Sequence, residues 1–128
     1  MNKAKVGEIW LAYFPKVSIN KNNTNIKLEK RPCLIVDDGQ GFIIESNCDY
    51  HALKITSKEK KKYIEIKKWY EIGLKKKSFV RIELPYKVEQ NQLIHKIGKV
   101  DKFDMYIYLH SLGEYINTEV IEKYKKGN

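Results

Sequence analysis

The stretch KRPCLIVDDG at residues 30–39 carries the apolar run on which the predicted fold is centred. The run CLIV after Pro32 predicts a buried strand, and Pro32 marks its beginning because proline has no backbone N–H to donate to a sheet. Asp38 and Gly39 supply the residues of a chain reversal. Arg31 therefore stands at the mouth of a core strand. It is either an exposed side chain that covers apolar surface with its stem or a cation directed at an anion.

Further strands are predicted on both sides of this run, at residues 7–14, 41–46, 51–57, 63–67, 78–84 and 95–100. Gly98 in the last of them indicates a bulge or a close backbone approach. Residues 16–30 are polar, rich in Asn and Lys and without an apolar period, so a long loop is predicted there. The segment WYEIGLKKK at residues 69–77 fits neither a helix nor a strand clearly.

The C-terminal part of the chain has a helical pattern. Asp101 is suited to cap a helix, with Asp104 three positions on, and Gly113 predicts its end. Residues 114–128 are expected to add a further helical extension. Because parallel strands would need crossover helices that this pattern lacks, we predict a mainly β fold. It is a small, strongly bent antiparallel barrel with a C-terminal helix, built as one domain over residues 1–128.

The chain is strongly basic, with 25 Lys and Arg residues against 16 Asp and Glu residues and a formal charge of +9. This excess favours a polyanionic partner, either nucleic acid or an acidic protein segment. Part of it lies in lysine runs at residues 58–62 and 75–77, which are also typical of solvated loops.

Cysteine content and hydropathy place the chain among cytoplasmic proteins. Cys33 and Cys48 are too few for a disulfide framework and have no metal-ligand spacing, and Cys33 is expected to be a buried thiol. No apolar stretch reaches the roughly 18 residues of a membrane span, and the N-terminus lacks the pattern of a signal peptide. We therefore expect a soluble protein with no membrane partner.

Strand alternation in SFVRIEL points to one group of candidate residues. Phe79, Arg81 and Glu83 are expected on one exposed face. The alternate residues are expected in the core: Val80, Ile82 and Leu84. The exposed face is either an ordinary surface with an ion pair or a platform on which the aromatic ring stacks a base, the cation meets a phosphate and the carboxylate moves a proton.

Thr56 and Ser57 form a second group, because their hydroxyls end a predicted strand just before a basic loop. That arrangement suits phosphate oxygens and is equally common in a turn. The three histidines, at positions 51, 95 and 110, have no partner at the spacing of a metal site or a catalytic triad. No glycine-rich phosphate loop, H-E-x-x-H or G-x-S-x-G motif is present, which excludes the common nucleotide-hydrolysing and serine-hydrolase classes.

The order of GEIWLAYFP, KRPCLIV, LKITS, FVRIELPYKVE and HKIGKV along residues 5–113 resembles the MazF/PemK/Kid toxins of bacterial type II toxin-antitoxin systems. The resemblance implies an SH3-like barrel that forms a two-fold homodimer. It implies a toxin that cleaves single-stranded RNA without a metal or other cofactor and so inhibits translation. It also implies a cognate antitoxin, whose acidic, flexible tail covers the RNA groove and with which such toxins bind DNA.

The resemblance also assigns residues. The R-P and T-S motifs place the functional pair of MazF-type members at Arg31 and Thr56, and the R-x-D of Kid-type members corresponds here to Arg81 and Glu83. Glu in place of Asp keeps the carboxylate and lengthens its reach. RNA contacts are expected from the residues around these positions: Ser18, Lys30, Ser57, Lys58 and Phe79. Kid-type members carry a histidine in the loop after the first strand, whereas residues 16–30 contain none, so its role is either absent or reassigned to Ser18 or a loop lysine.

These assignments give a mechanism in which Glu83 takes the proton of a ribose 2′-hydroxyl and the arginines stabilise the charge on the attacked phosphate. The group that protonates the leaving oxygen is then an arginine or a water by elimination. Two alternatives stay open: a non-catalytic barrel that resembles the CcdB gyrase poisons, and a family member that binds RNA without cutting it.

Overall fold

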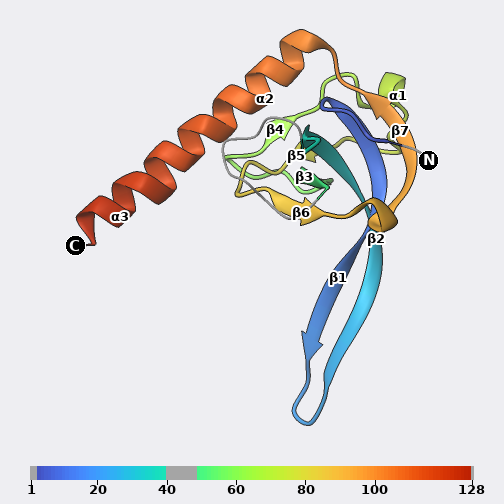
Figure 1. Cartoon of the computed structure of the whole chain (residues 1–128), viewed down its shortest axis with the longest axis vertical. Coiled ribbons are helices and arrows are strands. Elements are labelled where there is room, and N and C mark those ends of the chain that lie inside the picture. The colour runs from blue at the N-terminus through green and yellow to red at the C-terminus, as the bar shows by residue number, and fades with distance from the viewer. Residues whose placement is uncertain (1–2, 40–48, 128) are drawn as a thin grey trace.

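The computed structural model describes residues 3–39 and 49–127 and shows a strongly curled antiparallel sheet with a helical C-terminal segment (Figure 1). The strands are β1 (Glu8–Ile19), β2 (Thr24–Asp37), β3 (Tyr50–Thr56), β4 (Ile64–Glu65), β5 (Phe79–Val80), β6 (Tyr86–Val88) and β7 (Leu93–Lys99). Their order in the sheet is β4-β5-β3-β2-β1-β7, and β6 pairs with β3. The predicted mainly β, antiparallel, barrel-like fold with a C-terminal helix is confirmed.

Residues 16–30 are not a loop, so that prediction is wrong. They form most of a long hairpin in which β1 and β2 continue to a turn over residues 20–23, where the backbone N–H of Asn20 donates to the carbonyl of Asn23 at 2.8 Å. The physical reason is a period of two that the polar composition conceals. Val17 pairs with Ile26 on one face, while the pairs Lys16–Lys27 and Ser18–Asn25 occupy the other. This hairpin, residues 15–28, is called the arm and extends away from the rest of the sheet (Figure 1).

The GEIW motif, residues 7–10, lies at the start of β1, where β1 pairs with β7. Gly7 has φ of 92°, a left-handed conformation that favours glycine. The Glu8 carboxylate accepts hydrogen bonds from Trp10 Nε1 and from the backbone N–H of Lys5, each at 2.9 Å, and pairs with Lys96 Nζ at 3.0 Å. Burial alone would raise the pKa of Glu8, but the hydrogen bonds from Trp10, Lys96 and Lys5 outweigh it and lower the pKa. Glu8 is therefore a structural residue.

Alternation along the strands buries apolar side chains on both faces of the sheet. The first cluster contains Ile9, Leu34, Leu53 and Ile55 and is covered by Met105, Tyr108 and Leu112 of the C-terminal helix. The second lies on the opposite face and contains Trp10, Ala12, Phe14, Cys33, Ile35 and Ala52. Cys33 is fully buried, as predicted, and burial raises the pKa of its thiol to about 12.

The middle of the chain contains two short elements, α1 and β5. The ambiguous stretch forms α1 (Trp69–Ile72), which ends at Gly73 in the left-handed region. The strand predicted at residues 78–84 is short, because β5 ends at Val80. The predicted strand at residues 41–46 and Cys48 lie outside the described residues.

Gly98 has both properties predicted for it. The β1–β7 register shifts between Ile9, which pairs with Gly98, and Trp10, which pairs with Lys96. In addition, a Cβ atom at Gly98 would overlap the carbonyl oxygen of Ile72 in α1. Gly98 therefore lets α1 and the segment after it lie directly against β7.

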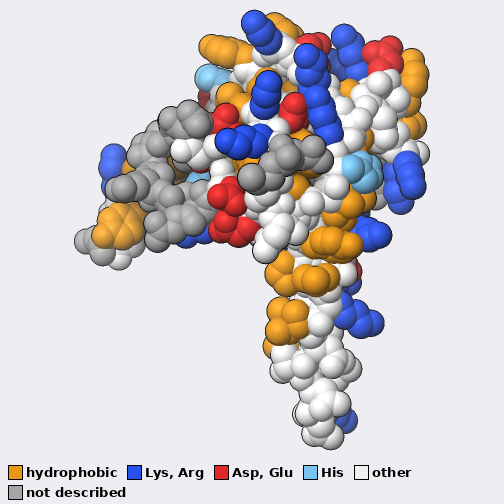
Figure 2. Space-filling view, turned by 45° about the vertical axis from the view of Figure 1, so that its right-hand side comes forward, with side chains coloured by type: hydrophobic (Ala, Val, Ile, Leu, Met, Phe, Trp, Pro, Cys, Tyr) orange, Lys and Arg blue, Asp and Glu red, His pale blue; other side chains and the backbone are white. Residues whose placement is uncertain are grey.

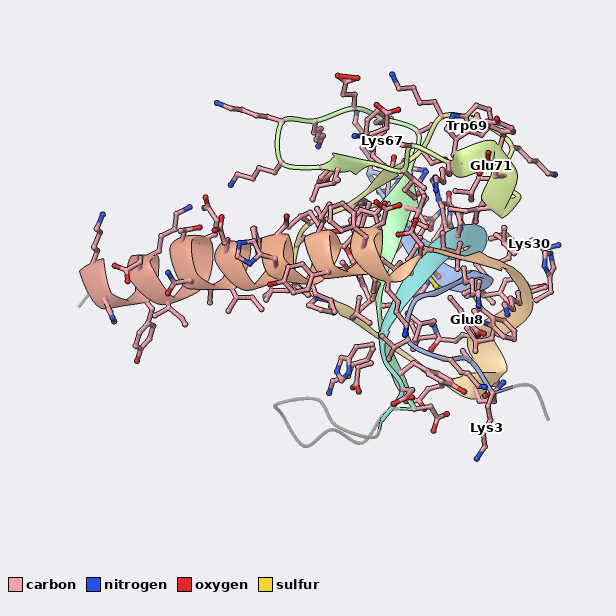
Figure 3. The ribbon with its side chains drawn as sticks, turned by 90° about the horizontal axis from the view of Figure 1, so that it is seen from above. Lys3, Glu8, Lys30, Lys67, Trp69 and Glu71 are labelled. Atoms are coloured by element: carbon pink, nitrogen blue, oxygen red, sulfur yellow. The ribbon has the colours of Figure 1, made fainter. Side chains whose placement is uncertain are left out.

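The helix begins as predicted, since Asp101 Oδ1 accepts from the backbone N–H of Asp104 at 2.8 Å at the start of α2 (Lys102–Tyr115). Gly113 does not end it, which corrects that prediction. The chain continues through a π-helical segment, Ile116–Ile121, into α3 (Glu122–Lys126), so residues 102–126 form one rod that runs away from the sheet (Figures 1 and 3). Within the described part of the chain, no helix is long and apolar enough to cross a membrane.

Candidate active site

The register between β2 and β3 places the R-P and T-S motifs side by side. Cys33 pairs with Lys54, and two residues further along this antiparallel register Arg31 lies opposite Thr56. Directly opposite residues share a face, and side chains two residues apart on a strand do too. Arg31, Lys54 and Thr56 therefore project from the same face as the buried thiol of Cys33.

The register between β3 and β5 adds the R-I-E motif to this face. Thr56 pairs with Phe79, and beyond the end of β5 the backbone N–H of Arg81 still donates to the carbonyl of Lys54 at 2.9 Å. Arg81 thus continues the alternation opposite Lys54. We call this surface the site face: Phe14, Glu29, Arg31, Lys54, Thr56, Arg81, Glu83 and Tyr86.

Arg31, Thr56 and Ser57 also line a common pocket of about 320 Å³. Its apolar lining includes Leu11, Pro32, Ile55, Leu74 and Ile97. Its polar lining adds Lys75, Lys76, Ser78 and His95. Cations and hydroxyls around an apolar floor suit a ligand that has both an anionic and an apolar part.

Arg31 rests on a carboxylate of its own strand. Its Nη2 and Nε lie 2.9 Å and 3.1 Å from Glu29 Oε2, and Lys16 Nζ lies 3.3 Å from Glu29 Oε1. The hydrogen bond from Arg31 is the largest cause of a lowered Glu29 pKa. The Arg31 side chain is half-exposed, so an incoming anion can compete with Glu29 for it.

Thr56 accepts a hydrogen bond on Oγ1 from the backbone N–H of Lys58 at 3.2 Å. This is the turn that its sequence also indicated. A hydroxyl that accepts one hydrogen bond can still donate its proton. Thr56 is therefore held in position with a donor available for an anion.

Arg81 and Glu83 form the second charged pair of the site face. Arg81 Nε lies 2.9 Å from Glu83 Oε1, and Nη2 donates to Oε2 at 3.3 Å. Nε and Oε1 are buried, and neither has a well-oriented hydrogen-bond partner. Burial would lower the pKa of Arg81, but Glu83 together with Tyr63 and Tyr86 outweighs it, and the pKa is raised. Glu83 is therefore a carboxylate that Arg81 holds in place on the site face.

Two expectations about the strand 78–84 are wrong. Phe79 is only 4% exposed and lies beside residues 59–65, so it is not an exposed stacking platform. Leu84 is 54% exposed and is not part of the core. The reason is that β5 ends at Val80, so alternation no longer fixes the direction of Leu84, while Phe79 lies between its strand partners Thr56 and Glu65.

The expected RNA-contact residues lie in three different places. Ser57 lines the pocket, and Lys58 is exposed beside it. Ser18 pairs with Asn25 in the arm, beyond the sheet body. Lys30 alternates with Arg31 and faces the other way, with Nζ 6.0 Å from the centroid of the Tyr13 ring. Figure 3 shows Lys30 on the side of the molecule opposite the C-terminal rod.

Sequence reasoning missed Lys54. Its Nζ lies 4.2 Å from the centroid of the Tyr86 ring and 5.0 Å from that of Phe14, and the two rings meet edge to face at 6.0 Å. The signal was present in LKITS, where strand alternation puts Lys54 on the same face as Thr56. The aromatic partners come from β1 and β6, far away in the sequence, and no local pattern indicates them.

Metal ligands are not gathered in the described part of the chain, where no group of three or more His, Cys, Asp or Glu side chains could hold an ion.

The sequence model of a family described as "PemK-like, MazF-like toxin of type II toxin-antitoxin system" matches residues 5–115. The match confirms the resemblance inferred from the motifs and covers nearly the same span. No curated protein matches the chain.

Proposed function

Because the chain belongs to the PemK-like, MazF-like family of type II toxins, we propose that it is an endoribonuclease. It cleaves single-stranded RNA when a ribose 2′-hydroxyl attacks the adjacent phosphate. The products are a 2′,3′-cyclic phosphate and a 5′-hydroxyl. The need for a 2′-hydroxyl explains selectivity for RNA over DNA.

One observation supports this proposal above the others. Arg31 on β2, Thr56 on β3 and the Arg81–Glu83 pair after β5 are distant in sequence but occupy one face of the curled sheet. Such a combination of cations, a hydroxyl donor and a carboxylate is what attack on a phosphate requires.

Each residue then has a role. Glu83 takes the proton of the 2′-hydroxyl while Arg81 holds its carboxylate in position. Arg81 and Arg31 stabilise the negative charge that develops on the phosphate, and Thr56 donates a hydrogen bond to one of its oxygens. The arginines do not act as acids, because a guanidinium keeps its proton near neutral pH.

RNA binding follows from the charge of the chain and the pocket beside the site face. The formal charge of +9 attracts the phosphate backbone. Lys75 and Lys76 in the pocket wall, with Lys58 nearby, supply cations for phosphates next to the cleaved one. Figure 2 shows many Lys and Arg side chains over the body of the molecule.

Type II toxins act with an antitoxin partner, and we propose that an acidic antitoxin segment competes with RNA for the same cations. We also propose that the protein is a cytoplasmic homodimer that inhibits translation and growth, and that it binds DNA together with its antitoxin. Residues 114–128 are proposed as an extension of the toxin domain.

A second candidate function is binding without cleavage. Two observations favour it: Arg31 and Arg81 are each already paired with a carboxylate, and residues 16–30 contain no histidine. Such a protein would bind RNA, or a protein such as gyrase, through the same surface.

Cleavage of a labelled single-stranded RNA in excess EDTA tests the proposal. We expect cyclic-phosphate products from RNA and no cleavage of a DNA of the same sequence. Glu83→Gln and Arg31→Ala are expected to reduce the rate by about 100-fold or more, whereas Glu122→Gln in α3 is expected to leave it unchanged. Wild-type rates in both site variants would disprove the assignment. Intact RNA together with gyrase trapped on supercoiled plasmid would establish the second candidate.

A further inference from the structure

The proposed reaction lacks a group that protonates the departing 5′-oxygen, and Lys54 on the site face is a candidate for it. Lys54 lies between the two functional pairs. On one side, Arg31 and Thr56 form the pair two positions further along the β2–β3 register. On the other side, the backbone N–H of Arg81 donates a hydrogen bond to the carbonyl of Lys54 at 2.9 Å. A phosphate held by both arginines is therefore adjacent to the Lys54 side chain.

The Lys54 ammonium is held against aromatic rings instead of a carboxylate. Its closest ring contacts are Tyr86 at 4.2 Å and Phe14 at 5.0 Å, and the side chain is partly buried. Among the ion pairs of the described residues, Glu29 is taken by Arg31 and Lys16, and Glu83 by Arg81. Ring contacts stabilise the ammonium and leave its N–H donors free for a phosphate ester.

Burial and the charges around it lower the pKa of Lys54 and make it a stronger acid than an ordinary lysine. Burial is the largest cause of its lowered pKa, and the positive charge of Arg81 comes next. Glu83 opposes this shift, Arg31 adds to it, and Glu29 opposes it, with a net lowering. A general acid transfers its proton more readily as its pKa approaches the working pH.

His95 is not an equivalent candidate, although it lines the pocket with Arg31. His95 pairs with Leu11, and Leu11 pairs with Pro32, so these three residues share a face. That face is opposite the one from which Arg31 projects, because Pro32 and Arg31 alternate along β2. Lys54 is on the same face as the proposed base, and His95 is not.

We propose that Lys54 is the general acid of this reaction, an inference that rests on the proposed ribonuclease function. The 2′-oxygen forms a bond to phosphorus as its proton passes to Glu83. The bond between phosphorus and the 5′-oxygen breaks, and the released electron pair takes a proton from Lys54 Nζ. The enzyme is left with protonated Glu83 and neutral Lys54, and exchange with water restores both.

The test compares two RNA substrates that differ in one atom. In one, the leaving group is the natural 5′-oxygen. In the other, a bridging sulfur replaces that oxygen and departs as a thiolate without needing a proton. Lys54→Ala and Lys54→Met are expected to cleave the natural RNA about 100-fold or more slowly than wild type and to cleave the sulfur-bridged RNA at close to the wild-type rate. Lys54→Arg keeps the charge but is a poor acid, so it should behave like Lys54→Ala.

Each outcome decides a separate point. Recovery on the sulfur-bridged RNA also shows that the variant is folded and retains its other groups. Equal losses on both substrates would mean that Lys54 acts through charge or packing and would overturn the proposal, as would an unchanged rate on the natural RNA. Lys126→Met in α3 serves as the matched control and should cleave both substrates like wild type. If wild type cleaves neither substrate, the proposed function itself fails and this inference fails with it.

Discussion

Replacement of Gly98 by alanine should destabilise the protein, because the space for a side chain at this position is already filled. A Cβ atom there would overlap the carbonyl oxygen of Ile72 and would lie 2.9 Å from Ile72 Cγ2 and 3.2 Å from its carbonyl carbon. Two of these three atoms belong to the backbone, so relief requires α1 to move away from β7. Overpacking of this kind costs about 1–3 kcal/mol.

Gly113→Ala is a control with the opposite expected sign. Nothing lies within 4 Å of a Cβ atom at Gly113, which sits inside α2 with no positive φ. Alanine should therefore stabilise the helix by about 0.5–1 kcal/mol.

Urea unfolding, followed by circular dichroism, measures both changes as shifts of the midpoint at constant slope. The segment after α1 carries Lys75 and Lys76 of the pocket, so Gly98→Ala should also weaken RNA binding in a Glu83→Gln background that prevents cleavage. If Gly98→Ala unfolds at the same urea concentration as wild type or at a higher one, α1 does not fill the space beside Gly98.

Three further predictions concern single residues. Glu29→Gln should release Arg31 and strengthen binding to a single-stranded RNA several-fold, measured by fluorescence anisotropy, and Glu122→Gln, which makes the same charge change far from the site, should have a smaller effect. Glu8 has a lowered pKa in the folded protein, so its contribution to stability is present above the unfolded pKa of about 4.3 and is lost as the pH falls through the folded pKa. Glu8→Gln should therefore flatten the acid side of a plot of unfolding free energy against pH. An unchanged plot would contradict this. In a Cys48→Ser background the buried thiol of Cys33 should not react with a thiol reagent at pH 8 until the protein is unfolded in urea.

The sequence by itself determined the features that depend on neighbouring residues. Pro32 and the apolar run after it marked a central strand, Asp101 marked the start of the helix, and Gly98 marked a close approach. In each case the signal is local, because a missing N–H, a capping side chain or an absent Cβ acts within a few residues of its own position. The order of the motifs was also sufficient to identify the toxin family.

Only the tertiary structure decided where side chains from separate strands meet. Most of residues 16–30 became part of the arm because β1 and β2 pair with each other, a long-range contact that outweighed their loop-like composition. Phe79 was buried where β5 pairs with β3 and β4, and Lys54 was placed between Phe14 and Tyr86, which its own strand does not specify. The sequence could name Arg31 and Thr56 separately, but cross-strand register brings them together, and register is set by packing of the whole sheet.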